Sequence, residues 1–224
     1  MSPPRGAIGI VLAGGRSRRL AAADLPPGGK PSLQLAGRTF LERIVGTVAA
    51  AVDRVFVVAA AGQSLPALPA DVEIVSDAAP HAGPLAGIRD GLAAAARLDP
   101  VPRTAFVCAA DVPLLRREVV ELIVNRGCLT SALWVVPEHA GHRQVLLSAV
   151  SPHLLPRIEG YLATGRRDPR GLLAALEAEA PTRVAVVTTA EIAAVDPAGD
   201  SFRDIDTPDD LAWLEHRGIP PSAP

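Results

Sequence analysis

Glycines and cations that could hold a phosphate group lie between Ile8 and Lys30. The run from Ala7 to Ala13 is apolar and ends at Gly14 and Gly15, a pattern that indicates a strand buried on both faces. Because glycine has no Cβ, the following loop can adopt positive φ and let its N–H groups approach phosphate oxygens. The cations of this stretch are Arg16, Arg18, Arg19 and Lys30. We therefore consider an anion site here, although an isolated Gly-Gly pair is better explained by a surface turn with solvated arginines.

Neither common phosphate-binding motif matches this stretch. A Walker loop reads G-x-x-x-x-G-K-[ST], whereas Pro31 follows Lys30 here and Asp24 stands at the position of the first glycine. A dinucleotide fingerprint reads G-x-G-x-x-G, and no glycine occurs between Gly15 and Gly28. A phosphate site in this chain must therefore be of another type.

Aspartates at the ends of apolar runs are the candidate metal ligands. Asp111 directly follows the apolar run 104–110, and a carboxylate at the edge of a core is costly unless a cation meets it. A divalent ion would do so; the alternative is that Asp111 caps a helix beginning near Leu115. Asp204 and Asp206 are solvated loop acids by default and become further ligands if the fold brings them opposite Asp111. Alternation along an extended segment predicts that Ile205, between them, faces the core.

Composition limits the kind of ligand and the location. The chain has 224 residues with 24 acidic and 22 basic side chains, and this near neutrality argues against nucleic acid as a partner. No apolar run approaches the about 20 residues that span a bilayer, and the N-terminus does not resemble a signal peptide. We expect a cytoplasmic protein with no membrane contact. Cys108 and Cys128 do not form a disulfide framework and are better explained as buried thiols.

Strand and helix patterns alternate along the chain. We expect strands at residues 7–13, 54–61, 72–75, 104–110, 132–136, 143–150 and 183–189. Helices are predicted after the capping box of Thr39 and Glu42, after Gly83-Pro84, around 119–126, and after Ser151-Pro152, Asp168-Pro169 and Thr207-Pro208. This alternation predicts right-handed βαβ units and an open, mostly parallel sheet with helices on both faces. Ligands of such sheets bind at the carboxyl ends of the strands, where Gly14, Asp77 and Asp111 would lie. We expect a single domain over residues 1–218, followed by a disordered Pro-rich tail at 219–224.

Five sequence blocks, in order along nearly the whole chain, carry a family resemblance. They are LAGGRSRRL, a downstream Lys-Pro, SDAAPHAGPLAGI, CAADVPLL and DIDTPDDLAWL. Together they resemble the nucleotidyltransferases of the molybdenum cofactor guanylyltransferase family, MobA-like enzymes with a three-layer α/β/α, Rossmann-like fold and a mostly parallel mixed sheet.

The resemblance implies transfer of GMP from GTP to the phosphate of molybdopterin, with Mg²⁺ as cofactor and release of pyrophosphate. It implies nucleotide contacts from Leu12, Ala13, Gly14, Gly15, Lys30, Asp77 and Asp111. Catalytic roles are implied for Arg19, Lys30 and Asp111, and metal ligation for Asp111; we add Asp206 as a candidate second ligand. The Leu-Ala-Gly-Gly order favours guanine, because cytidylyltransferase relatives tend to read Leu-Ala-Ala-Gly.

Three departures from the family pattern keep other functions open. A longer segment separates Arg19 from Lys30, the strand that includes Val55 ends in alanines where an asparagine is common, and Asp204 and Asp206 replace the usual asparagines. The first alternative is a cytidylyltransferase or sugar-phosphate nucleotidyltransferase of the same fold, acting on another phosphorylated small molecule. The second is a non-catalytic nucleotide-binding protein that contacts molybdoenzymes.

Overall fold

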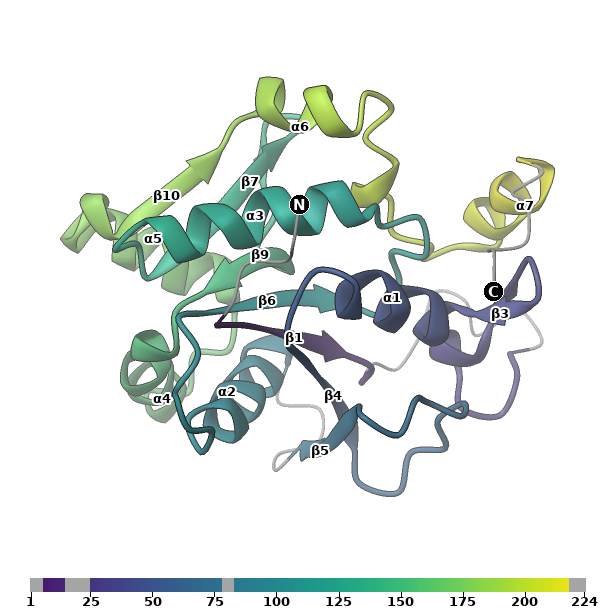
Figure 1. The fold of residues 1–224 in the computed structure, drawn as a ribbon, viewed down its shortest axis with the longest axis horizontal. Coiled ribbons are helices and arrows are strands. Elements are labelled where there is room, and N and C mark those ends of the chain that lie inside the picture. The colour runs from purple at the N-terminus through teal and green to yellow at the C-terminus, as the bar shows by residue number, and fades with distance from the viewer. Residues whose placement is uncertain (1–5, 15–24, 78–82, 218–224) are drawn as a thin grey trace.

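A mixed sheet with helices on both faces organises the chain (Figure 1). The computed structural model describes residues 6–14, 25–77 and 83–217. Within these ranges eight strands join one sheet in the order β10-β7-β9-β6-β1-β4-β5, with β8 paired to β7. Their bounds are β1 Ala7–Leu12, β4 Arg54–Ala60, β5 Glu73–Asp77, β6 Thr104–Ala109, β7 Trp134–His139, β8 His142–Arg143, β9 Leu147–Val150 and β10 Val184–Val187. β2 (Gln34–Leu35) and β3 (Arg38–Thr39) form a separate antiparallel hairpin.

The central strand β1 pairs in parallel with β4 on one side and β6 on the other. The pairs β4–β5 and β7–β10 are also parallel, and β9 runs antiparallel to both β6 and β7. From β1 the chain continues to β4 and β5 and then crosses to β6 on the opposite side. This reversal makes a topological switch point, where an open sheet has a crevice at the carboxyl ends of its strands. The mostly parallel mixed sheet predicted from the sequence is confirmed.

Helices cover both faces of the sheet, so the three-layer α/β/α architecture is also confirmed. α1, α3 and α6 pack on one face, and α2, α4 and α5 pack on the other. The helix bounds are α1 Phe40–Ala49, α2 Pro84–Ala95, α3 Arg117–Leu129, α4 Leu155–Ala163, α5 Pro169–Glu179, α6 Thr189–Val195 and α7 Pro208–His216. α7 lies outside these layers and packs with the β2–β3 hairpin in a small cluster that includes Leu35, Phe40, Ile205 and Leu214. No helix of the described ranges is long and apolar enough to span a membrane.

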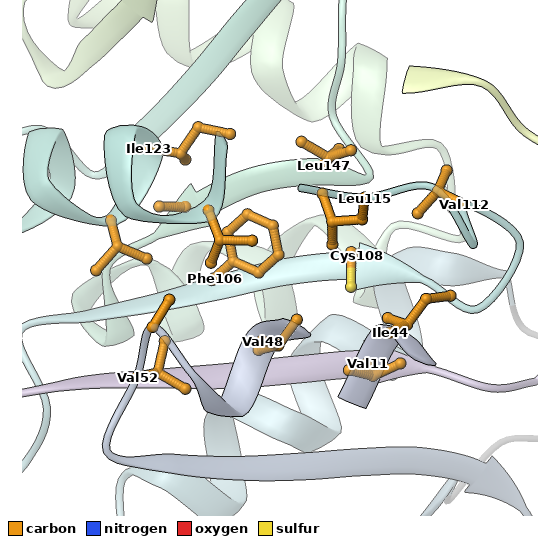
Figure 2. Packing of buried hydrophobic residues seen from close by; sticks show 14 of the residues in the cluster. Val11, Ile44, Val48, Val52, Phe106, Cys108, Val112, Leu115, Ile123 and Leu147 are labelled. Atoms are coloured by element: carbon orange, nitrogen blue, oxygen red, sulfur yellow. The ribbon is translucent and has the colours of Figure 1, made fainter. Parts of the chain in front are cut away.

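The core on the α1 and α3 face is continuous from β1 to the loop after β6 (Figure 2). Phe106 and Cys108 of β6 lie between Ile123 and Leu115 on one side and Val11 of β1 and Ile44 of α1 on the other. On the opposite face a glycine brings α2 close to β1. A Cβ added to Gly91 would lie 2.6 Å from the Cγ2 atom of an isoleucine of β1. Close packing on both faces holds β1 rigidly, and its carboxyl end is therefore a well-defined place for a site.

Helix starts follow the predicted caps closely. The capping box of Thr39 and Glu42 is formed, and Thr207 and Asp210 form another at α7. Asp168 caps α5 by accepting a hydrogen bond from the Gly171 N–H group. Ser151 also accepts a cap hydrogen bond, but from a short 3-10 turn that precedes α4. These starts were predictable because capping bonds join residues only a few positions apart.

Two local expectations, and one alternative left open by the sequence, are wrong. The predicted strand 143–150 is divided, because a turn from Gln144 to Leu147 separates β8 from β9. Thr188 does not extend β10 but forms a capping box with Glu191 and starts α6. Asp111 does not cap the next helix, since α3 begins at Arg117 with Arg116 at its N-cap. The division into a domain of 1–218 and a tail of 219–224 stays a prediction, and the tail lies outside the described residues.

Candidate active site

A cavity of about 900 Å³ lies at the carboxyl ends of β1, β4, β5 and β6. Four of the residues predicted from the sequence line it: Leu12, Gly14, Asp77 and Asp111. Two more, Ala13 and Lys30, line a smaller cavity of about 70 Å³ that shares Leu12, Gly14 and Asp111 with the large one. Gly15 and Arg19 lie outside the described residues. The switch point thus brings together six of the eight positions for which nucleotide or catalytic roles were predicted.

Gly14 is the first residue of the described chain to leave the sheet after β1. The Ala13 N–H group still donates to the Val58 carbonyl at 2.8 Å, and the Leu12 carbonyl accepts from Ala110 N–H at 3.0 Å. A Cβ placed on Gly14 would meet no atom within 4 Å. The carboxyl end of β1 is therefore anchored on both neighbouring strands, while Gly14 borders open space.

Gln63 is a cavity residue that the sequence reasoning missed. Its Oε1 atom accepts from Ala60 N–H at 3.1 Å, and its Nε2 group donates to the Ala13 carbonyl at 3.0 Å. The carboxamide thus ties the turn after β4 to the end of β1 and lines the large cavity. Its position depends on a turn in which Gly62 has φ +73°. The strand before this turn ends in alanines, so nothing in the sequence indicated that a polar side chain would reach the cavity from here.

Lys30 lies almost buried between two carboxylates. It begins a 3-10 turn (Lys30–Ser32) after Gly28 and Gly29, both of which have positive φ. Its Nζ atom lies 3.4 Å from Asp111 Oδ2 and also donates to Asp206 Oδ1, and only 8% of the residue is exposed. A signal for this position was present in the sequence, because Lys30 is the only lysine among the 22 basic side chains.

Asp206 reaches Lys30 because its neighbours fix the backbone. Ile205 is fully buried, as alternation predicted, and its N–H group donates to the Asp111 carbonyl at 2.9 Å. The N–H group of Asp206 itself donates to Asp210 Oδ2 at 3.2 Å. Asp204 is exposed and lines a different cavity, which it shares with Asp206. Of the two acids proposed from the sequence, the fold brings Asp206 to the Lys30 ammonium that Asp111 also contacts.

The electrostatics of this cluster favour an additional cation. Burial raises the pKa of the Asp111 carboxyl above its usual value; Lys30 opposes this shift, and Asp206 and Asp204 add to it. Two carboxylates share one ammonium, so the group of three carries a net negative charge when all are ionised. A bound cation would relieve both the desolvation of Asp111 and this excess charge.

Asp111 and Asp206 could hold a divalent ion jointly with a bound nucleotide. Both converge on one ammonium, and carboxylate oxygens are the ligands that hard cations prefer. In the parts of the chain that the structure describes, no group of three or more His, Cys, Asp and Glu side chains could hold a metal. Mg²⁺ is commonly bound by one or two carboxylates with substrate phosphates and water completing the shell. The donor set therefore fits an ion that arrives with phosphate groups.

Known proteins resemble this chain in sequence. A family model described as the MobA-like NTP transferase domain matches residues 9–181. A curated relative from Mycobacterium avium (strain 104), named probable molybdenum cofactor guanylyltransferase, is 40% identical over 174 residues, which are 76% of this chain and 82% of that protein.

Solved structures share the fold. Molybdopterin-guanine dinucleotide biosynthesis protein A from Archaeoglobus fulgidus has a TM-score of 0.73 at 21% identity, covering 94% of this chain and 97% of that one. A Mycobacterium tuberculosis H37Rv protein, solved as a complex with manganese, has a TM-score of 0.60 at 19% identity, with the same coverages of 94% and 97%. At these identities the likeness concerns the fold.

Proposed function

Because this chain belongs to the MobA-like NTP transferase family and is a nucleotidyltransferase, we propose that it transfers GMP from GTP to the phosphate of molybdopterin. The observation that carries this proposal is the convergence of Gly14, Lys30, Asp111 and Asp206 at the switch point of the sheet. A phosphate-binding turn, a cation and two metal-type carboxylates are the parts that phosphoryl chemistry needs. The large cavity, at about 900 Å³, falls within the range of small-molecule sites.

The reaction is a substitution at the α-phosphorus of GTP. An oxygen of the acceptor phosphate forms a bond to that phosphorus, and the bond to the oxygen bridging the α- and β-phosphorus atoms breaks. Pyrophosphate leaves with the electron pair of that bond. No general base is required because the attacking phosphate is already ionised, so positioning and charge neutralisation carry the catalysis.

The residues of this chain divide that work. In the proposal the N–H groups of the turn after β1 orient the triphosphate, Gly14 leaves room for the base, and Lys30 and Arg19 neutralise phosphate charge. Asp77, at the end of β5, contacts the nucleotide from the opposite wall. Mg²⁺, held by Asp111 and Asp206 together with phosphate oxygens, would neutralise charge on the transferred group when bound. Molybdoenzymes that receive the product are the partners implied by this function.

Measuring pyrophosphate release from the purified protein tests the proposal. Each of the four nucleoside triphosphates is supplied with Mg²⁺, with and without molybdopterin. We expect release only with the acceptor and fastest with GTP. Faster pyrophosphate release with CTP than with GTP would indicate a cytidylyltransferase instead. GTP binding detected by calorimetry without any pyrophosphate release would favour a non-catalytic role.

A further inference from the structure

The Lys30 ammonium occupies the position where a divalent ion would contact Asp111 and Asp206. Its Nζ atom touches both carboxylates, and the side chain is the most buried cation of the ion pairs in the described residues. Every other ion pair resolved in those residues uses an arginine. The single lysine of the chain has thus been placed where a compact point charge, rather than a planar guanidinium, fits between two carboxylates.

We propose that Lys30 is a tethered stand-in for the metal ion, occupying the Asp111–Asp206 pair until a divalent ion displaces it. This inference rests on the proposed function, since it assumes that these carboxylates receive the ion. Lys30 and the ion then compete for the same oxygens. In the nucleotide-free protein this competition keeps the affinity for the ion low.

Charge balance explains why the exchange depends on the nucleotide. The ammonium cancels one of the two carboxylate charges, and a divalent ion would cancel both and repel the ammonium. The displaced ammonium needs a new anion. The cavity of about 70 Å³ beside Lys30 is also lined by Ala13 and Gly14, so the side chain has space toward the turn where the triphosphate is proposed to bind. Nucleotide and metal ion therefore favour each other's binding, and by linkage the coupling is reciprocal.

Because the chain contains one lysine, this ammonium can be observed directly. Protein labelled with ¹⁵N-lysine gives one side-chain ammonium signal in ¹H–¹⁵N spectra, and its ion pairs should slow its proton exchange enough for detection. We expect Mg²⁺ added with a non-hydrolysable GTP analogue to shift this signal, because the ammonium exchanges carboxylate for phosphate contacts. If metal binding saturates, measured independently by calorimetry, while the signal stays unchanged, the inference is wrong.

Substitution at Lys30 gives a second test that does not depend on activity. Mn²⁺ binding to the nucleotide-free protein is followed by the electron paramagnetic resonance signal of free Mn²⁺. Lys30→Met removes the competing charge and should tighten Mn²⁺ binding by about tenfold or more, whereas the matched variant Lys30→Arg should not. Adding Asp206→Asn to Lys30→Met should abolish the gain.

Unchanged or weaker Mn²⁺ binding by folded Lys30→Met would overturn the proposal. Circular dichroism shows whether the variant is folded. If it is not folded, the spectra of the wild-type Lys30 ammonium group test the proposal instead. Pyrophosphate release by the wild-type protein is measured separately. Turnover without displacement of the ammonium refutes this inference alone, whereas the absence of turnover refutes the proposed function.

Discussion

Replacing Asp111 with asparagine is expected to lower activity and raise stability at neutral pH. The substitution keeps the side-chain shape but removes a charge from the cluster that contains Lys30 and Asp206. One unit charge interacting with another at about 4 Å contributes about 4 kcal/mol at an effective dielectric constant of about 20. Because the carboxylate is partly open to solvent, we expect its removal to raise the activation free energy by about 2–4 kcal/mol. This corresponds to a loss of about 30-fold to about 1,000-fold in kcat/KM.

The stability effect has the opposite sign because burial raises the pKa of Asp111 in the folded protein. A carboxyl group with a raised folded-state pKa binds protons more tightly in the folded than in the unfolded chain. Stability therefore falls as pH rises from the ordinary carboxyl pKa toward the raised value. Asparagine avoids this loss. We expect Asp111→Asn to gain about 1 kcal/mol at pH 7, or about 2–4 °C in Tm, and nothing below pH about 4.

Pyrophosphate release in the presence of Mg²⁺ measures the effect on activity. Thermal unfolding of the same preparations without metal ions measures the effect on stability. Asp71→Asn is the matched control, because Asp71 is an exposed carboxylate in the β4–β5 connection and should change neither quantity. Full activity of Asp111→Asn would show that this carboxylate has no role in the reaction. A lower Tm at pH 7 would mean that the attraction to Lys30 outweighs the cost of burial.

Three further predictions concern packing, the nucleotide turn and the Asp206 segment. Gly91→Ala places a methyl group 2.6 Å from an isoleucine of β1 and should cost about 1–3 kcal/mol in urea unfolding; Gly160→Ala, with no atom within 4 Å, should gain up to about 1 kcal/mol. Gln63→Ala removes the amide that donates to the Ala13 carbonyl at the end of β1 and should raise the KM for GTP by about tenfold, equivalent to one hydrogen bond, with little change in kcat. Asp210→Ala removes the carboxylate half of the α7 capping box, which accepts from the Thr207 N–H and Oγ1 groups, and the acceptor for the Asp206 N–H group. It should cost about 1–2 kcal/mol of stability and weaken Mn²⁺ binding by calorimetry.

Specific results would contradict these three predictions. Equal effects at Gly91 and Gly160 would show that helix propensity alone decides them. A fall in kcat with unchanged KM would place Gln63 in the chemical step. For Asp210, Thr207 hydrogen bonding lowers the pKa of the carboxyl group below its usual value, so its stabilising effect should fade as pH drops through that range. A stability cost that does not depend on pH would contradict the capping role.

Much of the fold was predictable from patterns between near neighbours in the sequence. The apolar runs that became β1 and β6 contain no charged residue, and only a strand buried on both faces accommodates such runs at this length. Helix starts at Thr39, Asp168 and Thr207 followed from caps. Thr188 was missed because its capping box directly follows apolar residues that read as a continuing strand.

The sequence alone determined which chemical groups are available and that the ends of parallel strands would present them. Only the tertiary structure decided that Lys30 meets Asp111 and Asp206, which lie 81 and 176 residues further along the chain. It also placed Gln63 against the end of β1 and gave β9 its antiparallel direction. The physical reason is range: caps and strand patterns depend on bonds and packing between adjacent residues, whereas a charge cluster depends on the order in which distant strands pair.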